Sequence, residues 1–161
     1  MKIGCVKEIK KHEYRVGMTP ACVAAYVQRG HQVYIQNGAG EGAGFSDDEY
    51  RAAGAQILTK AEDIYGSCEM IIKVKEPQPS EYPLLREGQI LFTYLHLAAD
   101  EEQTRALLKN KVTGIAYETI RLDDGTLPCL APMSEIAGRL SVQEGAKYLE
   151  RPFGGRGILL G

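Results

Sequence analysis

The segment Gln89-Ile90-Leu91-Phe92-Thr93-Tyr94-Leu95-His96-Leu97-Ala98 decides how this chain is interpreted. Residues 89–94 form an apolar run typical of a buried β-strand, and an ionisable imidazole follows closely after the run. Ligands bind at the carboxyl ends of the strands in α/β sheets, and histidine is the side chain best suited to moving a proton near neutral pH. The segment alone supports equally an acid/base at a sheet edge and a hydrogen-bonded structural histidine.

Strand-like and helix-like patterns alternate on both sides of this segment. The expected strands are residues 2–6, 31–36, 55–58, 70–74, 89–94 and 112–117, the last three of them buried. Helices are expected to begin at Thr19-Pro20, at the capping boxes Ser46-x-x-Glu49 and Thr59-x-x-Glu62, at Asp100, and at Ser134. Repeated βα units of this kind predict an α/β fold, with a mostly parallel sheet flanked by helices. The pattern from Ser134 to about residue 149 predicts a long final helix.

The composition is that of an ordinary globular domain. The 161 residues are 44% hydrophobic and 25% charged, with a formal net charge of −2. Neither a basic run nor a long apolar stretch is present, so we expect no nucleic-acid or membrane partner. The start of the chain lacks the apolar core of a signal peptide. The four cysteines lack C-x-x-C spacing, which predicts reduced thiols, no metal site and a cytoplasmic protein.

The glycine-rich segment from Gly38 to Gly44 imitates a dinucleotide-binding loop. Gly38-x-Gly40-x-x-Ala43 fits the relaxed form of that motif, and it lies between an expected strand and an expected helix. The helix is short, and no acidic residue ends the next strand. A flexible glycine turn is therefore the favoured interpretation, with cofactor binding as the alternative.

Polar side chains follow several of the expected strands. Arg15, Lys75, His96 and Glu118 each lie near the carboxyl end of a different strand. Taken singly, Arg15 is explained as a solvated charge and Lys75 as a lysine whose stem lies on apolar surface. Together they predict a pocket for a small anionic molecule, with a group that transfers protons. Ser134 either caps the last helix or helps to hold a phosphate there.

Several longer motifs resemble alanine dehydrogenase, in order and along the whole chain. They are Lys7-Glu8-Ile9, Arg15-Val16, Thr19-Pro20, Gly38-Ala39-Gly40, Gly44-Phe45-Ser46, Lys73-Val74-Lys75-Glu76-Pro77, Leu91-Phe92-Thr93-Tyr94-Leu95-His96-Leu97-Ala98, Ala116-Tyr117-Glu118-Thr119 and Ala131-Pro132-Met133-Ser134-Glu135-Ile136-Ala137-Gly138-Arg139. The resemblance implies an NAD-dependent enzyme that converts L-alanine, NAD and water to pyruvate, ammonia and NADH. It also implies a homo-oligomer, typically a hexamer.

The resemblance assigns roles to individual residues. It implies that Arg15 and Lys75 hold the substrate carboxylate and carbonyl, and that His96 is the acid/base, with Lys75 also catalytic. Glu118 and Met133 would line the substrate pocket, and Ser134 would approach the cofactor phosphates. An imidazole can serve as acid and as base in such a reversible reaction.

Alanine dehydrogenases are much longer than this chain, so the resemblance implies their N-terminal half. We expect an incomplete, Rossmann-like or flavodoxin-like substrate and catalytic domain over residues 1–131. A linking helix over residues 132–150 and the entry to an NAD-binding domain over residues 151–161 would follow. The main NAD-binding domain would then be absent from this chain, and the isolated chain would be inactive.

Two alternatives stay open beside this interpretation. One is the N-terminal domain of a nicotinamide nucleotide transhydrogenase, which shares the fold but lacks the Tyr94-Leu95-His96-Leu97 run. The other is a non-catalytic module that binds keto acids or assembles with another chain.

Overall fold

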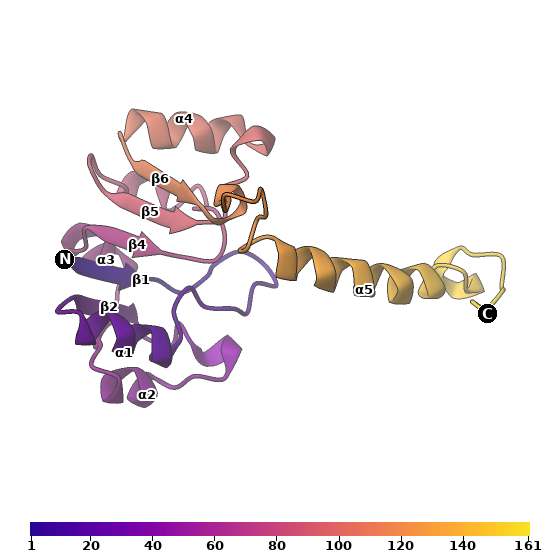
Figure 1. Ribbon diagram of the computed structural model, residues 1–161, viewed down its shortest axis with the longest axis horizontal. Coiled ribbons are helices and arrows are strands. Elements are labelled where there is room, and N and C mark those ends of the chain that lie inside the picture. Colours follow the sequence, from indigo (N-terminus) through magenta and orange to yellow (C-terminus); the bar gives the residue numbers. More distant parts are fainter. The chain divides into compact units, whose positions relative to one another are not determined.

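The six predicted strands form one sheet in which all neighbouring strands are parallel, as predicted (Figure 1). The computed structural model describes all residues, 1–161. The strand order is β3-β2-β1-β4-β5-β6. The strands are β1 (Lys2–Cys5), β2 (Gln32–Gln36), β3 (Gln56–Leu58), β4 (Met70–Ile72), β5 (Ile90–Thr93) and β6 (Thr113–Ala116).

Helices connect the strands and cover both faces of the sheet. α1 and α2 pack on one face, in a core that includes Val23, Ile35 and Tyr50. α3 and α4 pack on the other face, around Ile64, Leu91 and other buried side chains. The helices are α1 (Pro20–Gln28), α2 (Asp47–Ala52), α3 (Ala61–Ser67), α4 (Glu101–Lys109) and α5 (Ala131–Lys147), with 3₁₀ turns η1 (Glu41–Ala43), η2 (Tyr82–Leu84), η3 (Leu97–Ala99), η4 (Tyr117–Thr119) and η5 (Arg151–Phe153).

The strand order makes this a doubly wound, Rossmann-like sheet, in which successive connections turn in opposite directions on either side of β1. The order reverses between β1 and β4, which pair in register from Ile3 with Met70 to Cys5 with Ile72. In open α/β sheets, ligands bind outside the carboxyl ends of the strands at such a switch point. The loops that follow β1 and β4 therefore frame the position where a site is expected.

Most of the predicted helix starts are confirmed. Thr19 accepts a hydrogen bond from the Cys22 amide at α1, and Asp100 accepts one from Gln103 at α4. The predicted capping box at Ser46 and Glu49 is present in full. These helix starts could be predicted from the sequence because each capping hydrogen bond joins residues only three positions apart.

Three local predictions are wrong. α3 is not capped by Thr59, because the helix begins one residue later, after Lys60, without a side-chain cap. β6 is not buried: it is an edge strand that pairs only with β5, and Thr113, Gly114 and Ile115 are exposed. α5 begins at Ala131, with a proline in its first turn, so Ser134 is the fourth helical residue.

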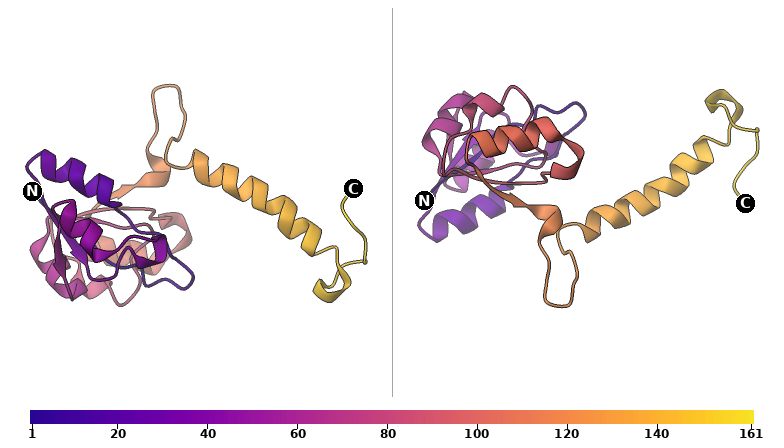
Figure 2. Two further views of the ribbon diagram at one scale, coloured as in Figure 1. Left: turned by 90° about the horizontal axis from the view of Figure 1, so that it is seen from below. Right: turned by 90° about the horizontal axis from the view of Figure 1, so that it is seen from above.

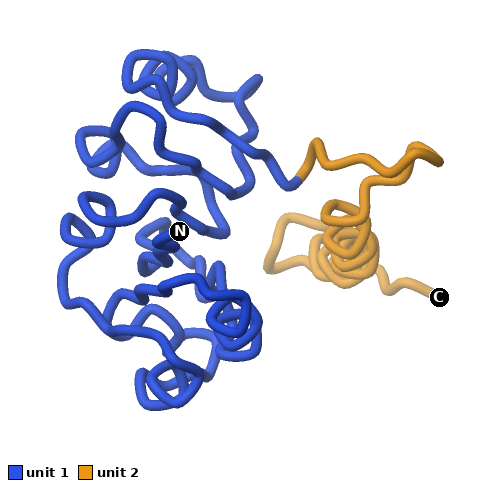
Figure 3. Tube along the Cα trace, turned by 60° about the vertical axis from the view of Figure 1, so that its left-hand side comes forward, with its two compact units in different colours: residues 1–117 blue, residues 118–161 orange.

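The chain divides into two compact units, residues 1–117 and residues 118–161 (Figure 3). The first contains the whole sheet and α1 to α4. The second begins within η4 and continues through a loop with a turn at Gly125, the long helix α5 and η5 (Figure 2). None of the helices has the length and apolar character needed to cross a membrane.

Candidate functional site

The loop after β1 carries Arg15, whose guanidinium is paired with a neighbouring carboxylate. Its Nε and Nη2 donate to Glu13 Oε1 and Oε2 at 2.8 and 2.6 Å, and its backbone N–H donates to Glu13 Oε1 at 2.9 Å. The Glu13 side chain is 7% exposed, whereas that of Arg15 is 49% exposed. These hydrogen bonds from Arg15 lower the pKa of Glu13, and the Lys75 ammonium acts in the same direction. Arg15 is thus held in one orientation by Glu13, and the Lys75 ammonium is close enough to act on the Glu13 carboxylate.

The loop after β4 carries Lys75, which is half-buried. Its backbone N–H donates to Glu8 Oε1 at 3.3 Å, and its carbonyl accepts from Thr93 Oγ1 at 2.8 Å. The loop then continues into Glu76 and Pro77. Lys75 is therefore fixed through its backbone by Glu8, which follows β1, and by Thr93, the last residue of β5.

His96 follows β5 in a left-handed backbone conformation, with φ 48° and ψ 40°. Few residues other than glycine adopt this conformation, and it clusters at functional sites because the surrounding structure must impose it. The imidazole is exposed, and its ring is nearly parallel to that of Tyr94, with centroids 6.1 Å apart. His96 and Lys75 line the same surface pocket of 270 Å³. The structure thus brings these two predicted residues together.

Arg15 lines a separate pocket, together with Glu8, Glu13 and the glycine-rich segment. Tyr94 nevertheless raises the pKa of Arg15 electrostatically, after the larger effect of Glu13. Tyr94 also stacks on His96, so it connects the surroundings of the two residues. Arg15, Lys75 and His96 therefore follow β1, β4 and β5 at the same edge of the sheet, as the sequence predicted.

A buried lysine two residues before Lys75 is paired with two glutamates, and the sequence alone predicted neither its burial nor these partners. The Lys73 side chain is fully buried, with its Nζ 2.9 Å from Glu81 Oε1 and 3.4 Å from Glu8 Oε2. The hydroxyl of Tyr65 also donates to Glu81 Oε1 at 2.9 Å. One signal was available, because a lysine inside the apolar run of residues 70–74 requires a carboxylate partner when it is buried.

The glycine-rich segment is a packing turn, and most of its amides donate within the chain. The Gly38 amide donates to Asp47 Oδ1, and the amides of residues 39, 41, 43, 44 and 45 donate to nearby carbonyls. A methyl group at Gly42 would lie 2.8 Å from the Tyr14 carbonyl oxygen, so this glycine allows the Arg15 loop to approach. These observations support the turn interpretation and do not fit a dinucleotide cradle.

Glu118, Met133 and Ser134 belong to the second unit. Glu118 and Met133 are half-buried there, and Ser134 is exposed. The Ser134 amide and hydroxyl both donate to the Leu130 carbonyl, at 3.1 and 3.3 Å. Its amide is thus engaged within the helix and does not present a free donor to a phosphate.

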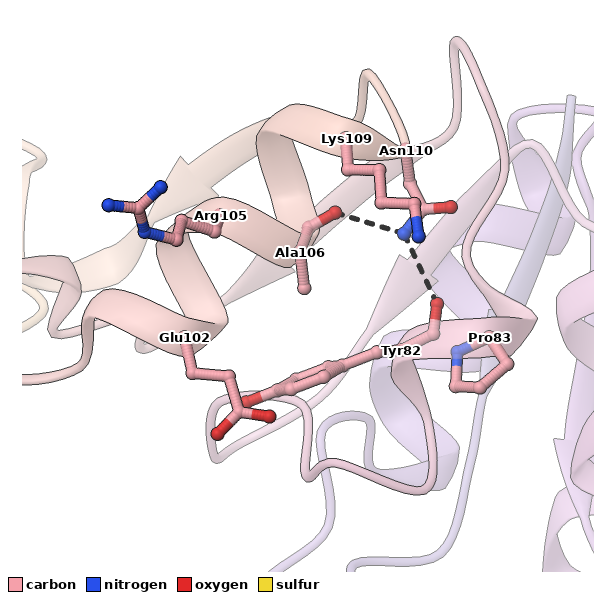
Figure 4. A pocket seen from close by; sticks show the side chains of 7 residues that line it. All are labelled: Tyr82, Pro83, Glu102, Arg105, Ala106, Lys109 and Asn110. Carbon is pink, nitrogen blue, oxygen red and sulfur yellow. Dashed lines mark hydrogen bonds between the residues drawn. The ribbon is translucent and has the colours of Figure 1, made fainter.

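A larger pocket of 370 Å³ lies between η2 and α4 (Figure 4). Its lining includes Tyr82, Glu102 and Asn110, and the Asn110 amide donates to the carbonyls of Tyr82 and Ala106. None of the predicted site residues lines it. Its size alone therefore does not make it the candidate site.

Comparison with known proteins gives the family. Residues 4–137 match the family described as alanine dehydrogenase/PNT, N-terminal domain. The chain belongs to this family. It is 60% identical to the alanine dehydrogenase of Methanococcus maripaludis, and 55% identical to those of Mycolicibacterium smegmatis and Geobacillus stearothermophilus. Each match covers the whole chain and 43% of the relative, so the chain spans less than half the length of these enzymes.

Solved structures place the chain within the family in the same way. An L-alanine dehydrogenase structure matches all of the chain at 56% identity, with a TM-score of 0.89 and 44% of that structure covered. A transhydrogenase from Sinorhizobium meliloti matches 73% of the chain at 27% identity, with a TM-score of 0.69 and 34% of that structure covered. The transhydrogenase is thus a more distant relative of this N-terminal domain.

Proposed function

We propose that the chain is the substrate-binding and catalytic portion of an L-alanine dehydrogenase. The assembled enzyme would convert L-alanine, NAD and water to pyruvate, ammonia and NADH. The observation that carries the proposal is the arrangement of Arg15, Lys75 and His96 after β1, β4 and β5, at the carboxyl edge of a doubly wound sheet. Identity of 53–60% to alanine dehydrogenases over the whole chain supports it.

Each residue of the site has a role that its surroundings support. Glu13 occupies Nε and Nη2 of Arg15, so a substrate carboxylate would bind the edge formed by Nη1 and Nη2. The Lys75 ammonium would stabilise negative charge on the carbonyl oxygen. His96 would pass a proton to and from the substrate oxygen and nitrogen, as acid in one direction and base in the other. Glu118 and Met133 are proposed to complete the lining of the substrate pocket.

The cofactor is not held by the residues of this chain alone. Most N–H groups of the glycine-rich segment, and the Ser134 amide, already donate within the chain, which argues against a dinucleotide cradle built from these amides. We therefore assign NAD binding mainly to the portion of the longer relatives that these 161 residues do not cover. Ser134 would at most contribute its hydroxyl near the cofactor phosphates. A cytoplasmic homo-oligomer, hexameric in its complete form, belongs to the same proposal.

The proposal is tested with the chain joined to the C-terminal portion of the M. maripaludis enzyme, called here the joined enzyme. The joined enzyme is expected to form NADH from L-alanine and NAD. The 161-residue chain alone and the C-terminal portion alone are expected to form none, because hydride transfer needs both reactants in one site. Absence of turnover in a folded joined enzyme, or turnover by the chain alone, would contradict the proposal.

The two alternatives predict different results in the same system. Binding of pyruvate that survives Arg15→Ala, measured by calorimetry, would argue against the assigned pocket and for a different binding module. Hydride exchange between nicotinamide cofactors that is undiminished by His96→Ala would favour the transhydrogenase function. The proposal predicts loss of pyruvate binding in the first experiment and no such exchange in the second.

A further inference from the structure

The segment that carries Lys75 has a strand neighbour on one side only. Pairing between β1 and β4 ends at Cys5 with Ile72. On the β5 side, pairing continues beyond β4: the Lys73 N–H donates to the Phe92 carbonyl at 3.1 Å, and the Tyr94 N–H donates to the Val74 carbonyl at 3.2 Å. The Val74 amide therefore lacks a backbone acceptor from β1, and the chain bends at Val74 and Lys75 so that the Lys75 amide turns to the same side.

The Glu8 carboxylate takes the place of that missing backbone acceptor. Its Oε1 accepts the Val74 N–H at 2.6 Å and the Lys75 N–H at 3.3 Å. A charged acceptor makes stronger hydrogen bonds than a carbonyl does. The Glu8 side chain is 2% exposed, so water does not compete for the same donors.

The Glu8 carboxylate is itself held in place by a buried lysine. Its Oε2 lies 3.4 Å from the buried Lys73 ammonium, which is held by Glu81 at 2.9 Å. The second oxygen of Glu81 accepts the Gln78 N–H at 2.8 Å, beyond the loop that contains Lys75. The buried charges thus hold both ends of residues 73–78, in which Pro77 has no amide donor of its own.

We propose that Glu8 is a positioning residue for Lys75, which it acts on through the backbone amides rather than by touching substrate. The inference rests on the proposed function, because it takes its meaning from the role of the Lys75 ammonium. The second buried carboxylate, Glu81, supplies the matched comparison. Both carboxylates neutralise Lys73 and each accepts an amide of residues 73–78, but only Glu8 accepts the amide of Lys75, whereas Glu81 accepts that of Gln78.

Four proteins separate positioning from general stability: the wild type, Glu8→Ala, Glu8→Gln and Glu81→Ala. Amide hydrogen exchange is measured on the 161-residue chain, and the KM for pyruvate and kcat are measured on the joined enzyme. Glu8→Ala is expected to raise the rate of hydrogen exchange at the Lys75 amide at least about tenfold, because this amide loses its hydrogen bond to a charged acceptor. It is also expected to raise the KM for pyruvate well above that of Glu81→Ala. Glu8→Gln keeps an acceptor oxygen and is expected to restore both quantities toward the wild type.

Equal changes in Glu8→Ala and Glu81→Ala would overturn the inference, because they would show a shared effect of an uncompensated Lys73. Wild-type exchange at Lys75 in Glu8→Ala would overturn it as well. If the wild-type joined enzyme has no turnover, the proposed function fails, and the exchange rates still decide whether Glu8 holds Lys75.

Discussion

The two compact units differ in what fixes their side chains. In residues 1–117, two cores and a buried ion pair hold the loops that carry Arg15, Lys75 and His96. In residues 118–161, no residue of α5 is buried, and Ile136, Leu140 and Val142 are exposed. Substitutions in the first unit should therefore change the stability of the chain itself. Substitutions in α5 should leave that stability almost unchanged.

The largest expected effect comes from the buried ammonium. Lys73→Met leaves Glu8 and Glu81 buried without their cation, and it should lower the free energy of unfolding by about 3–5 kcal/mol. The matched change in the second unit, Lys147→Met, breaks an exposed pair with Glu144 and should cost about 1 kcal/mol or less. Urea unfolding followed by circular dichroism measures both. Equal losses would contradict the contrast between the units.

A leucine pair tests the same contrast without charge. Leu91 is fully buried in β5, so Leu91→Ala should cost about 2–5 kcal/mol through lost burial and a cavity. Leu140 in α5 is 49% exposed, so Leu140→Ala should change the free energy of unfolding by less than about 0.5 kcal/mol. Urea unfolding measures both variants. A large decrease in the free energy of unfolding for Leu140→Ala would show that α5 is packed within the chain.

Alanine substitutions at two glycines are expected to change the stability of the chain in opposite directions. A methyl group at Gly42 meets the Tyr14 backbone at 2.8 Å, so Gly42→Ala should destabilise by about 1–3 kcal/mol and displace the Arg15 loop. Nothing lies within 4 Å of a methyl group at Gly138, inside α5. Gly138→Ala should therefore stabilise the helix by up to about 1 kcal/mol. Thermal unfolding measures both variants, and destabilisation by Gly138→Ala would argue against an open helix face.

The smallest effect concerns Glu13 and depends on pH. The pKa of Glu13 is lowered below its ordinary value of 4.5 by the hydrogen bonds from Arg15. The stability that this ion pair contributes is therefore fully present above pH 4.5, and it is lost as the pH falls through the lower folded value. Near neutral pH, the free energy of unfolding of the wild type should exceed that of Glu13→Gln by about 1 kcal/mol or less, as measured by urea unfolding. This gap should close in acid, and a gap that widens in acid would contradict the assignment.

Much of the fold follows from local sequence signals. The caps at Thr19, Ser46 and Asp100 join residues three apart, and the alternation of strands and helices implies parallel pairing. The exposed edge position of β6 could not be predicted, because burial of an apolar run depends on whether a further strand pairs with it. A proline in the first turn moved the start of α5 upstream of Ser134.

The sheet edge at which three candidate site residues lie was predictable, whereas the contacts that support them were not. Arg15, Lys75 and His96 follow strands, so their shared edge could be inferred from the strand pattern. The contacts of Glu8 and Glu81 with Lys73 join residues far apart in sequence or on different loops, and no local pattern encodes them. The pairing of Glu13 with Arg15 depends on how their loop folds back, which only the three-dimensional structure shows.

We propose His96 as the group that transfers protons in an L-alanine dehydrogenase site. The most direct test compares kcat for L-alanine in the joined enzyme with His96→Ala and with His31→Ala, a control histidine next to the N-terminal end of β2. We expect His96→Ala to lower kcat by about 10²–10⁴-fold, as for loss of an acid/base, and His31→Ala to leave it unchanged. His96→Ala that turns over as fast as His31→Ala would contradict the claim.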